Sequence, residues 1–120
     1  MDYSLRYPEG FGKFSEADVK FKLTSDQKKV VAYYDNSVLY NDFVINEIFK
    51  IFSADDSLIV YLSDHGENLY ENGRLGHGME SRFSYEIPLL FIASREFLTA
   101  NATLWQKRRE IGRASCRERV

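Results

Sequence analysis

The ten residues LIVYLSDHGE, 58–67, decide both the fold and the candidate site. The first five, LIVYL, are apolar at both alternations, which is typical of a strand covered on both faces. The stretch then turns polar and reaches Asp64, His65 and Gly66. In open α/β sheets, ligands bind just beyond the carboxyl ends of the strands. The stretch therefore predicts a buried strand that delivers an acid and an imidazole to a sheet edge.

Asp64 and His65 form a candidate metal pair, because a carboxylate oxygen and a neutral imidazole nitrogen suit zinc or a similar divalent ion. Adjacent residues of an extended strand point to opposite faces, but a turn at Gly66 allows both side chains to face one point. Further along, His77 lies in a Gly-His-Gly triplet whose glycines allow the imidazole to return toward the same place. The alternative is structural: Asp64 caps a turn and His65 is a surface residue. The residues alone leave both interpretations open.

Around this stretch, the order of elements is helix, strand, long loop, strand and helix. Apolar residues recur near a 3.6-residue period over residues 31–52, which predicts an amphipathic helix. Residues 58–62 and 87–93 predict two buried strands, and the polar, glycine-containing stretch 63–86 predicts a loop between them. Residues 94–109 return to a helical pattern. This order predicts an α/β fold with a largely parallel sheet and helices on its faces.

Length and composition fit one small domain or a piece of a larger one. The chain has 120 residues, of which 44% are hydrophobic, so it is globular rather than disordered. The net charge of −2 gives no reason to expect nucleic-acid binding. Two strands do not form a stable sheet of the predicted kind alone, so we expect the chain to be truncated.

The end of the chain differs from the rest. Residues 110–120, EIGRASCRERV, have no hydrophobic period and contain the only Cys. They resemble the translation of a sequencing adapter, so we expect a non-native tail and restrict the domain to residues 1–109.

Four segments together resemble the bacterial phosphoethanolamine transferases of the alkaline phosphatase and sulfatase superfamily. YLSDHGENLYENGRLGHG, 61–78, resembles their C-terminal metal-site loop. AYYDNSVLYNDFVINEIFKIF, 32–52, is similar to the helix that precedes it. YSLRYPEGFGKF, 3–14, and EIPLLFIAS, 86–94, match two further family segments in order. The resemblance covers about residues 3–100 and implies part of an alkaline-phosphatase-like sheet flanked by helices.

Carried over residue by residue, the resemblance makes Asp64 and His65 zinc ligands. It places His77 near the substrate phosphate or a second zinc, and gives Asp35 and Asn36 a role in helix packing and hydrogen bonding rather than in catalysis. Glu67 is expected to be a solvated loop residue. The family's nucleophilic threonine and remaining acidic ligand match nothing here, so no residue of this chain is assigned as catalytic.

The resemblance implies a two-step transfer. A zinc-bound threonine attacks the phosphorus of phosphatidylethanolamine, and phosphoethanolamine then moves to lipid A or another envelope glycan. The parent protein is expected in the bacterial inner membrane, with its catalytic domain in the periplasm and membrane contact only through a missing N-terminal region. The chain alone is expected to be inactive. The alternatives are a sulfatase or phosphoglycerol transferase of the same superfamily, or a non-catalytic α/β module that binds a partner.

Overall fold

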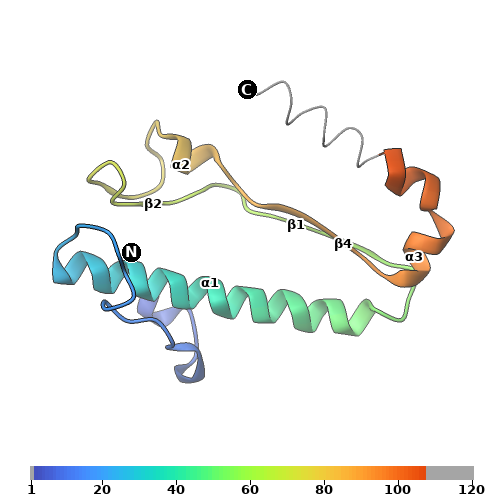
Figure 1. The fold of residues 1–120 in the computed structure, drawn as a ribbon, viewed down its shortest axis with the longest axis horizontal. Coiled ribbons are helices and arrows are strands. Elements are labelled where there is room, and N and C mark those ends of the chain that lie inside the picture. The colour runs from blue at the N-terminus through green and yellow to red at the C-terminus, as the bar shows by residue number, and fades with distance from the viewer. Residues whose placement is uncertain (1, 108–120) are drawn as a thin grey trace. The chain divides into compact units, whose positions relative to one another are not determined.

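The computed structural model describes residues 2–107 (Figure 1), so the predicted tail at 110–120 lies outside the described residues. The chain divides into two compact units. Of the described residues, one unit contains 2–47 and 62–89, and the other contains 48–61 and 90–107. Among the described residues, no helix is both long enough and apolar enough to cross a bilayer.

Helix α1, Ser25–Phe52, begins several residues before the apolar period and ends where the prediction places its end. A reciprocal capping arrangement explains its start. The Gln27 backbone N–H donates to Thr24 Oγ1 over 3.3 Å, and the Thr24 backbone N–H donates to Gln27 Oε1 over 3.0 Å. Because these bonds satisfy N–H groups that have no partner within a helix, they fix the first turn ahead of the apolar period.

The core of the first unit lies on one side of α1. Three residues are buried and three partly buried ones pack against them: Val19, Val31, Ala32, Leu23, Leu69 and Tyr70. Two aromatic contacts extend this packing. Tyr3 meets Tyr34 edge to face with ring centroids 5.4 Å apart, and Phe11 lies 4.9 Å from Tyr40. The N-terminal segment is therefore held against α1 by one buried and several partly buried aromatic side chains.

Asn36 fastens the N-terminal segment to α1 by hydrogen bonds. Asn36 is a buried residue, only 1% exposed. Its Oδ1 accepts from the backbone N–H groups of Lys13 and Phe14, both over 2.8 Å. Its Nδ2 donates to the Phe14 carbonyl over 3.0 Å and to the Tyr7 hydroxyl over 3.3 Å. The predicted packing and hydrogen-bonding role of Asn36 is confirmed.

Strands β1, Leu58–Leu62, and β4, Leu89–Ala93, lie mainly in the second unit and pair as a two-stranded ribbon (Figure 1). The Ser94 N–H, just after β4, donates to the Ser57 carbonyl, just before β1, over 3.0 Å. The strands therefore run antiparallel, and the predicted parallel arrangement is wrong. A parallel pair needs a crossover that returns the chain to its starting end. Here the connection folds at the end where β1 finishes, so β4 starts from that end.

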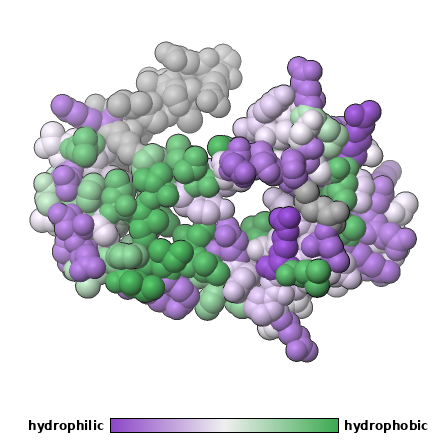
Figure 2. Space-filling model, turned by 180° about the vertical axis from the view of Figure 1, so that it is seen from behind, coloured by the Kyte–Doolittle hydropathy of each residue, from purple (hydrophilic) through white to green (hydrophobic). Residues whose placement is uncertain are grey.

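The prediction that both strands are covered on both faces is also wrong for the described residues. Leu58, Val60 and Leu62 are 38%, 47% and 57% exposed. A two-stranded ribbon buries few of its side chains, because burial on both faces requires further layers. Figure 2 shows a broad hydrophobic area, and the second unit contributes exposed apolar residues that include Ile51 and Leu90.

The segment predicted as one long loop, residues 63–86, contains short strands and a short helix. Strands β2, Asn68–Leu69, and β3, Leu75–Gly76, form an antiparallel hairpin, and helix α2, Arg82–Tyr85, follows. The fully buried Asn68 joins the hairpin to the start of α2. Its Nδ2 donates to the Gly76 carbonyl over 3.0 Å and to Ser84 Oγ over 2.9 Å. Its Oδ1 accepts from Ser81 Oγ over 2.8 Å. Helix α3, Arg95–Ala100, follows β4 and is capped by Ser94 Oγ, which accepts from the Phe97 N–H.

Candidate functional site

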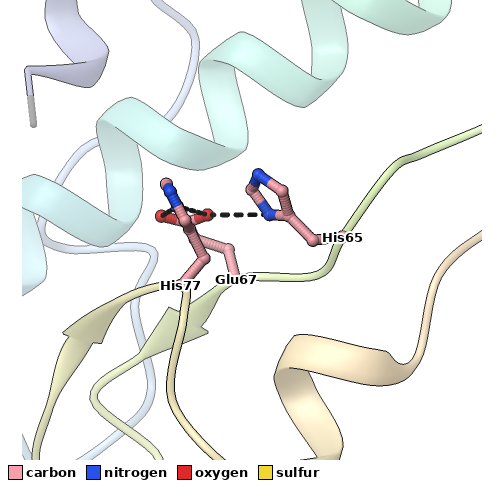
Figure 3. Close-up of side chains that lie close together, drawn as sticks. All are labelled: His65, Glu67 and His77. Atoms are coloured by element: carbon pink, nitrogen blue, oxygen red, sulfur yellow. Dashed lines mark hydrogen bonds and ion pairs between the residues drawn. The ribbon is translucent and has the colours of Figure 1, made fainter.

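His65, Glu67 and His77 converge in the first unit (Figure 3). His65 follows β1, Glu67 directly precedes β2, and His77 directly follows β3. Each offers one ligand atom, and these atoms lie within 4.8 Å of one another. The two imidazole rings are 4.1 Å apart between centroids and tilted by 31°. The hairpin thus brings together both histidines of the chain around one carboxylate.

Glycines shape the backbone at this site, but for different reasons. Gly76 and Gly78, on either side of His77, have φ values of 107° and 77°, so the predicted bend at this triplet is confirmed. Gly66 does not adopt a positive φ and is needed for space instead. Its N–H donates to the Ser84 carbonyl over 2.9 Å, and a Cβ at this position would overlap the Phe83 carbonyl oxygen. Glycine is therefore required at position 66 because the backbone passes close to α2, and not because of a turn with positive φ.

Glu67 was expected in solvent, and that prediction is wrong. Its side chain is only 9% exposed, and its Oε1 accepts from the Tyr3 hydroxyl over 2.6 Å. Its Oε2 lies 3.2 Å from His77 Nδ1 and 3.8 Å from His65 Nδ1. The spacing of His65 and Glu67 could have indicated that Glu67 faces the site, since residues two apart on an extended chain share a face.

Tyr3 is the buried residue that holds Glu67 in this place by a hydrogen bond. It is 2% exposed, and the Arg6 guanidinium lies 5.1 Å from its ring centroid. Burial, together with the hydrogen bond to Glu67, raises the pKa of the Tyr3 hydroxyl above its usual range. Tyr3 therefore remains a hydrogen-bond donor to Glu67 at neutral and mildly alkaline pH.

Asp64 lies next to His65 but outside the group of three. Its side chain is 88% exposed, and its Oδ1 accepts from the His65 backbone N–H over 3.1 Å. The same oxygen is 3.9 Å from His65 Nε2. On its other side, His65 Nδ1 is 2.9 Å from the Gly66 carbonyl oxygen. If Nδ1 carries the proton and donates to that carbonyl, the Nε2 lone pair faces the same region as the Asp64 carboxylate.

A cavity of about 560 Å³ opens beside these two residues. It is lined by Asp64, His65, Gly78, Met79, Glu80, Ser84 and Tyr85. The Asp64–His65 pair therefore faces a space large enough for a small polar group, with carboxylates and one aromatic ring on its walls.

Comparison with known proteins places this chain in a family. Residues 1–113 match the Sulfatase family. The phosphoethanolamine transferase EptA of Salmonella typhimurium is 32% identical over 79% of this chain and 19% of its own length. EptC of Escherichia coli O18:K1:H7 is 36% identical, over 81% and 18%. The phosphatidylethanolamine transferase Mcr-2 of Escherichia coli is 37% identical, over 68% and 16%.

The chain thus spans about a fifth of the length of the first two of these relatives. The family match, in contrast, covers nearly all of the chain, including every residue of the candidate site. The resemblance predicted from four sequence segments is confirmed. The chain belongs to the sulfatase family, and its relatives there are phosphoethanolamine transferases.

Proposed function

We propose that this chain is part of a zinc-dependent transferase that moves phosphoethanolamine from phosphatidylethanolamine to lipid A or another envelope glycan. The observation that carries the proposal is the convergence of both histidines on one carboxylate, beside Asp64, in a chain whose relatives are named phosphoethanolamine transferases. A further relative from Salmonella typhimurium, 25% identical, is named Kdo(2)-lipid A phosphoethanolamine 7''-transferase. That name supports a lipid A acceptor.

The donor atoms of Asp64 and His65 fit zinc. Zinc binds imidazole nitrogen and carboxylate oxygen at about 2.0–2.2 Å, so neighbouring ligands of a tetrahedral shell are about 3.4 Å apart. Asp64 Oδ1 and His65 Nε2 are 3.9 Å apart, close to that spacing. When bound, zinc supplies a positive charge that offsets the negative charge of phosphoryl oxygens. Asp64 and His65 would hold this ion, and His77 would contact the substrate phosphate or a second ion.

The remainder of the reaction is assigned to the whole enzyme. We propose a threonine-linked intermediate whose threonine lies outside this chain, so the chain alone is inactive. We place the parent protein in the bacterial inner membrane with its catalytic domain in the periplasm. We further propose that residues 1–109 belong to the catalytic domain and that residues 110–120 are a non-native tail.

Zinc affinity tests the metal site directly. Competition with a chromophoric chelator is measured for the unaltered chain and for His65→Ala and Asp64→Asn, with Asp56→Asn as a control that removes an exposed carboxylate elsewhere. We expect zinc binding to weaken at least tenfold in both site variants and to be unchanged in the control, since each removes one ligand. Equal zinc affinity in all four proteins would refute the assignment. Phosphoethanolamine transfer by the chain above a His65→Ala background would refute its inactivity.

A further inference from the structure

Three side chains form a continuous hydrogen-bonded series that leads from the interior of the first unit to its surface. The Tyr3 hydroxyl donates to Glu67 Oε1 over 2.6 Å, and Glu67 Oε2 lies 3.2 Å from His77 Nδ1. Tyr3 is 2% exposed, while the side chains of Glu67 and His77 are 9% and 40% exposed. The series therefore has a fixed, buried end and an accessible end.

The direction of each hydrogen bond follows from the chemistry of the groups. An ionised carboxylate only accepts hydrogen bonds. The single Tyr3 hydroxyl proton goes to Oε1, so Oε2 is left to accept from the imidazole of His77. His77 Nδ1 must therefore carry a proton, and in a neutral ring the lone pair is then on Nε2. The carboxylate thus selects one of the two neutral forms of His77.

Tyr3 makes this selection rigid. Its ring is held edge to face against Tyr34, and the Arg6 guanidinium lies over it, so the hydroxyl has little freedom. A buried carboxylate with a single weak partner would rotate or draw in water. With Tyr3 in place, one oxygen of Glu67 is occupied and the other is aimed at His77.

We propose that Tyr3 and Glu67 are positioning residues that hold His77 with its Nδ1–H on the Glu67 carboxylate, so that Nε2 is the ring nitrogen left to meet a ligand. The use of that Nε2 atom rests on the proposed function, but the protonation pattern is a property of the chain itself. Carboxylates commonly orient metal-binding histidines in this way, through the ring nitrogen that does not bind the metal.

Nitrogen-15 NMR of the metal-free chain at pH 8 tests the inference, because ring nitrogens with and without a proton have well separated shifts. The chain has only two histidines, so His65→Ala assigns the signals of His77. We expect the Nδ1–H form to predominate. The ratio of the Nδ1–H form to the Nε2–H form should fall about tenfold in Glu67→Ala, because this variant loses one charge-assisted hydrogen bond. Glu67→Gln keeps one acceptor and should fall between the two.

The Tyr3→Phe variant tests the anchor separately from the carboxylate. We expect it to lower the same ratio about threefold, whereas Tyr33→Phe, which removes a hydroxyl from an exposed residue of α1, should leave it unchanged. An unaltered chain with His77 mainly in the Nε2–H form would overturn the proposal. So would equal ratios in Tyr3→Phe and Tyr33→Phe, with both chains shown to be folded by their amide spectra.

Zinc titration of the same samples separates this inference from the proposed function. The expected Nδ1–H pattern without any zinc binding would refute the zinc site at Asp64 and His65 in this chain and leave the positioning role standing. Zinc binding by a chain in which His77 is mainly Nε2–H would refute the positioning role and leave the function standing.

Discussion

Replacing Asn36 with Ala should destabilise the chain by about 2–4 kcal/mol. The substitution removes four hydrogen bonds, two accepted by Oδ1 and two donated by Nδ2. A net contribution of about 1 kcal/mol for each bond gives an upper figure of about 4 kcal/mol. The lower figure applies because Lys13 and Phe14 lie on an exposed segment, where water can replace part of the lost bonding.

Urea unfolding followed by the circular dichroism of α1 measures this change. Asn46→Ala is a matched control, because Asn46 is an exposed residue of the same helix and the change in helix propensity is the same at both positions. The control should alter stability by no more than about 0.5 kcal/mol. Asn36→Asp keeps the acceptor but loses the donor, and should lie between the two. If Asn36→Ala and Asn46→Ala agree within about 0.5 kcal/mol, Asn36 is not the fastening point inferred here.

Three further predictions concern the segment that carries the site. Gly66→Ala should destabilise the chain by about 3 kcal/mol in urea unfolding, because its Cβ would overlap a backbone oxygen, whereas Gly10→Ala, with open space around its Cβ, should not. Asn68→Ala should speed hydrogen exchange of the Tyr70 amide, which donates to the Arg74 carbonyl in the same hairpin, at least tenfold, and unchanged exchange would contradict its role in joining hairpin and helix. The raised pKa of Tyr3 means that the unfolded chain ionises first, so stability should fall as pH rises above about 10. Tyr3→Phe should lessen that fall, as measured by unfolding at successive pH values, and an identical pH slope would contradict the assignment.

Local sequence patterns were enough to locate the main elements. The apolar period located α1, and the run LIVYL gave the bounds of β1. Strand direction was not predictable in the same way, because it depends on the path of residues 63–88, which folds around Asn68 through contacts between residues 8 to 16 apart. The order helix–strand–loop–strand favoured a parallel sheet. The folded loop instead ends near the C-terminal end of β1, and a strand that starts there runs antiparallel to β1.

The part of the site that was predictable is the part that local sequence specifies, namely the residue types and their neighbours along the chain. His65 and His77 were identified by their place after a strand and between glycines, and the structure brings their rings together. Whether they bind a metal with Asp64 stays a prediction. Glu67 was missed because its burial comes from Tyr3, 64 residues earlier in the chain, and no local pattern records such a contact. A polar loop composition indicates solvent exposure unless a distant residue covers it.

The N-terminal segment is therefore part of the candidate site rather than an appendage to it. Asn36 fixes residues 13 and 14 and contacts Tyr7, while Tyr3, at the start of the same segment, holds Glu67. Without this segment, Asn36 would be left with four unmet hydrogen bonds, and Glu67 would have no hydroxyl to occupy Oε1. The stability of the first unit and the orientation of His77 thus depend on the same few contacts. This explains why a buried tyrosine and asparagine, neither of which offers a metal ligand, belong to the chemistry of the site.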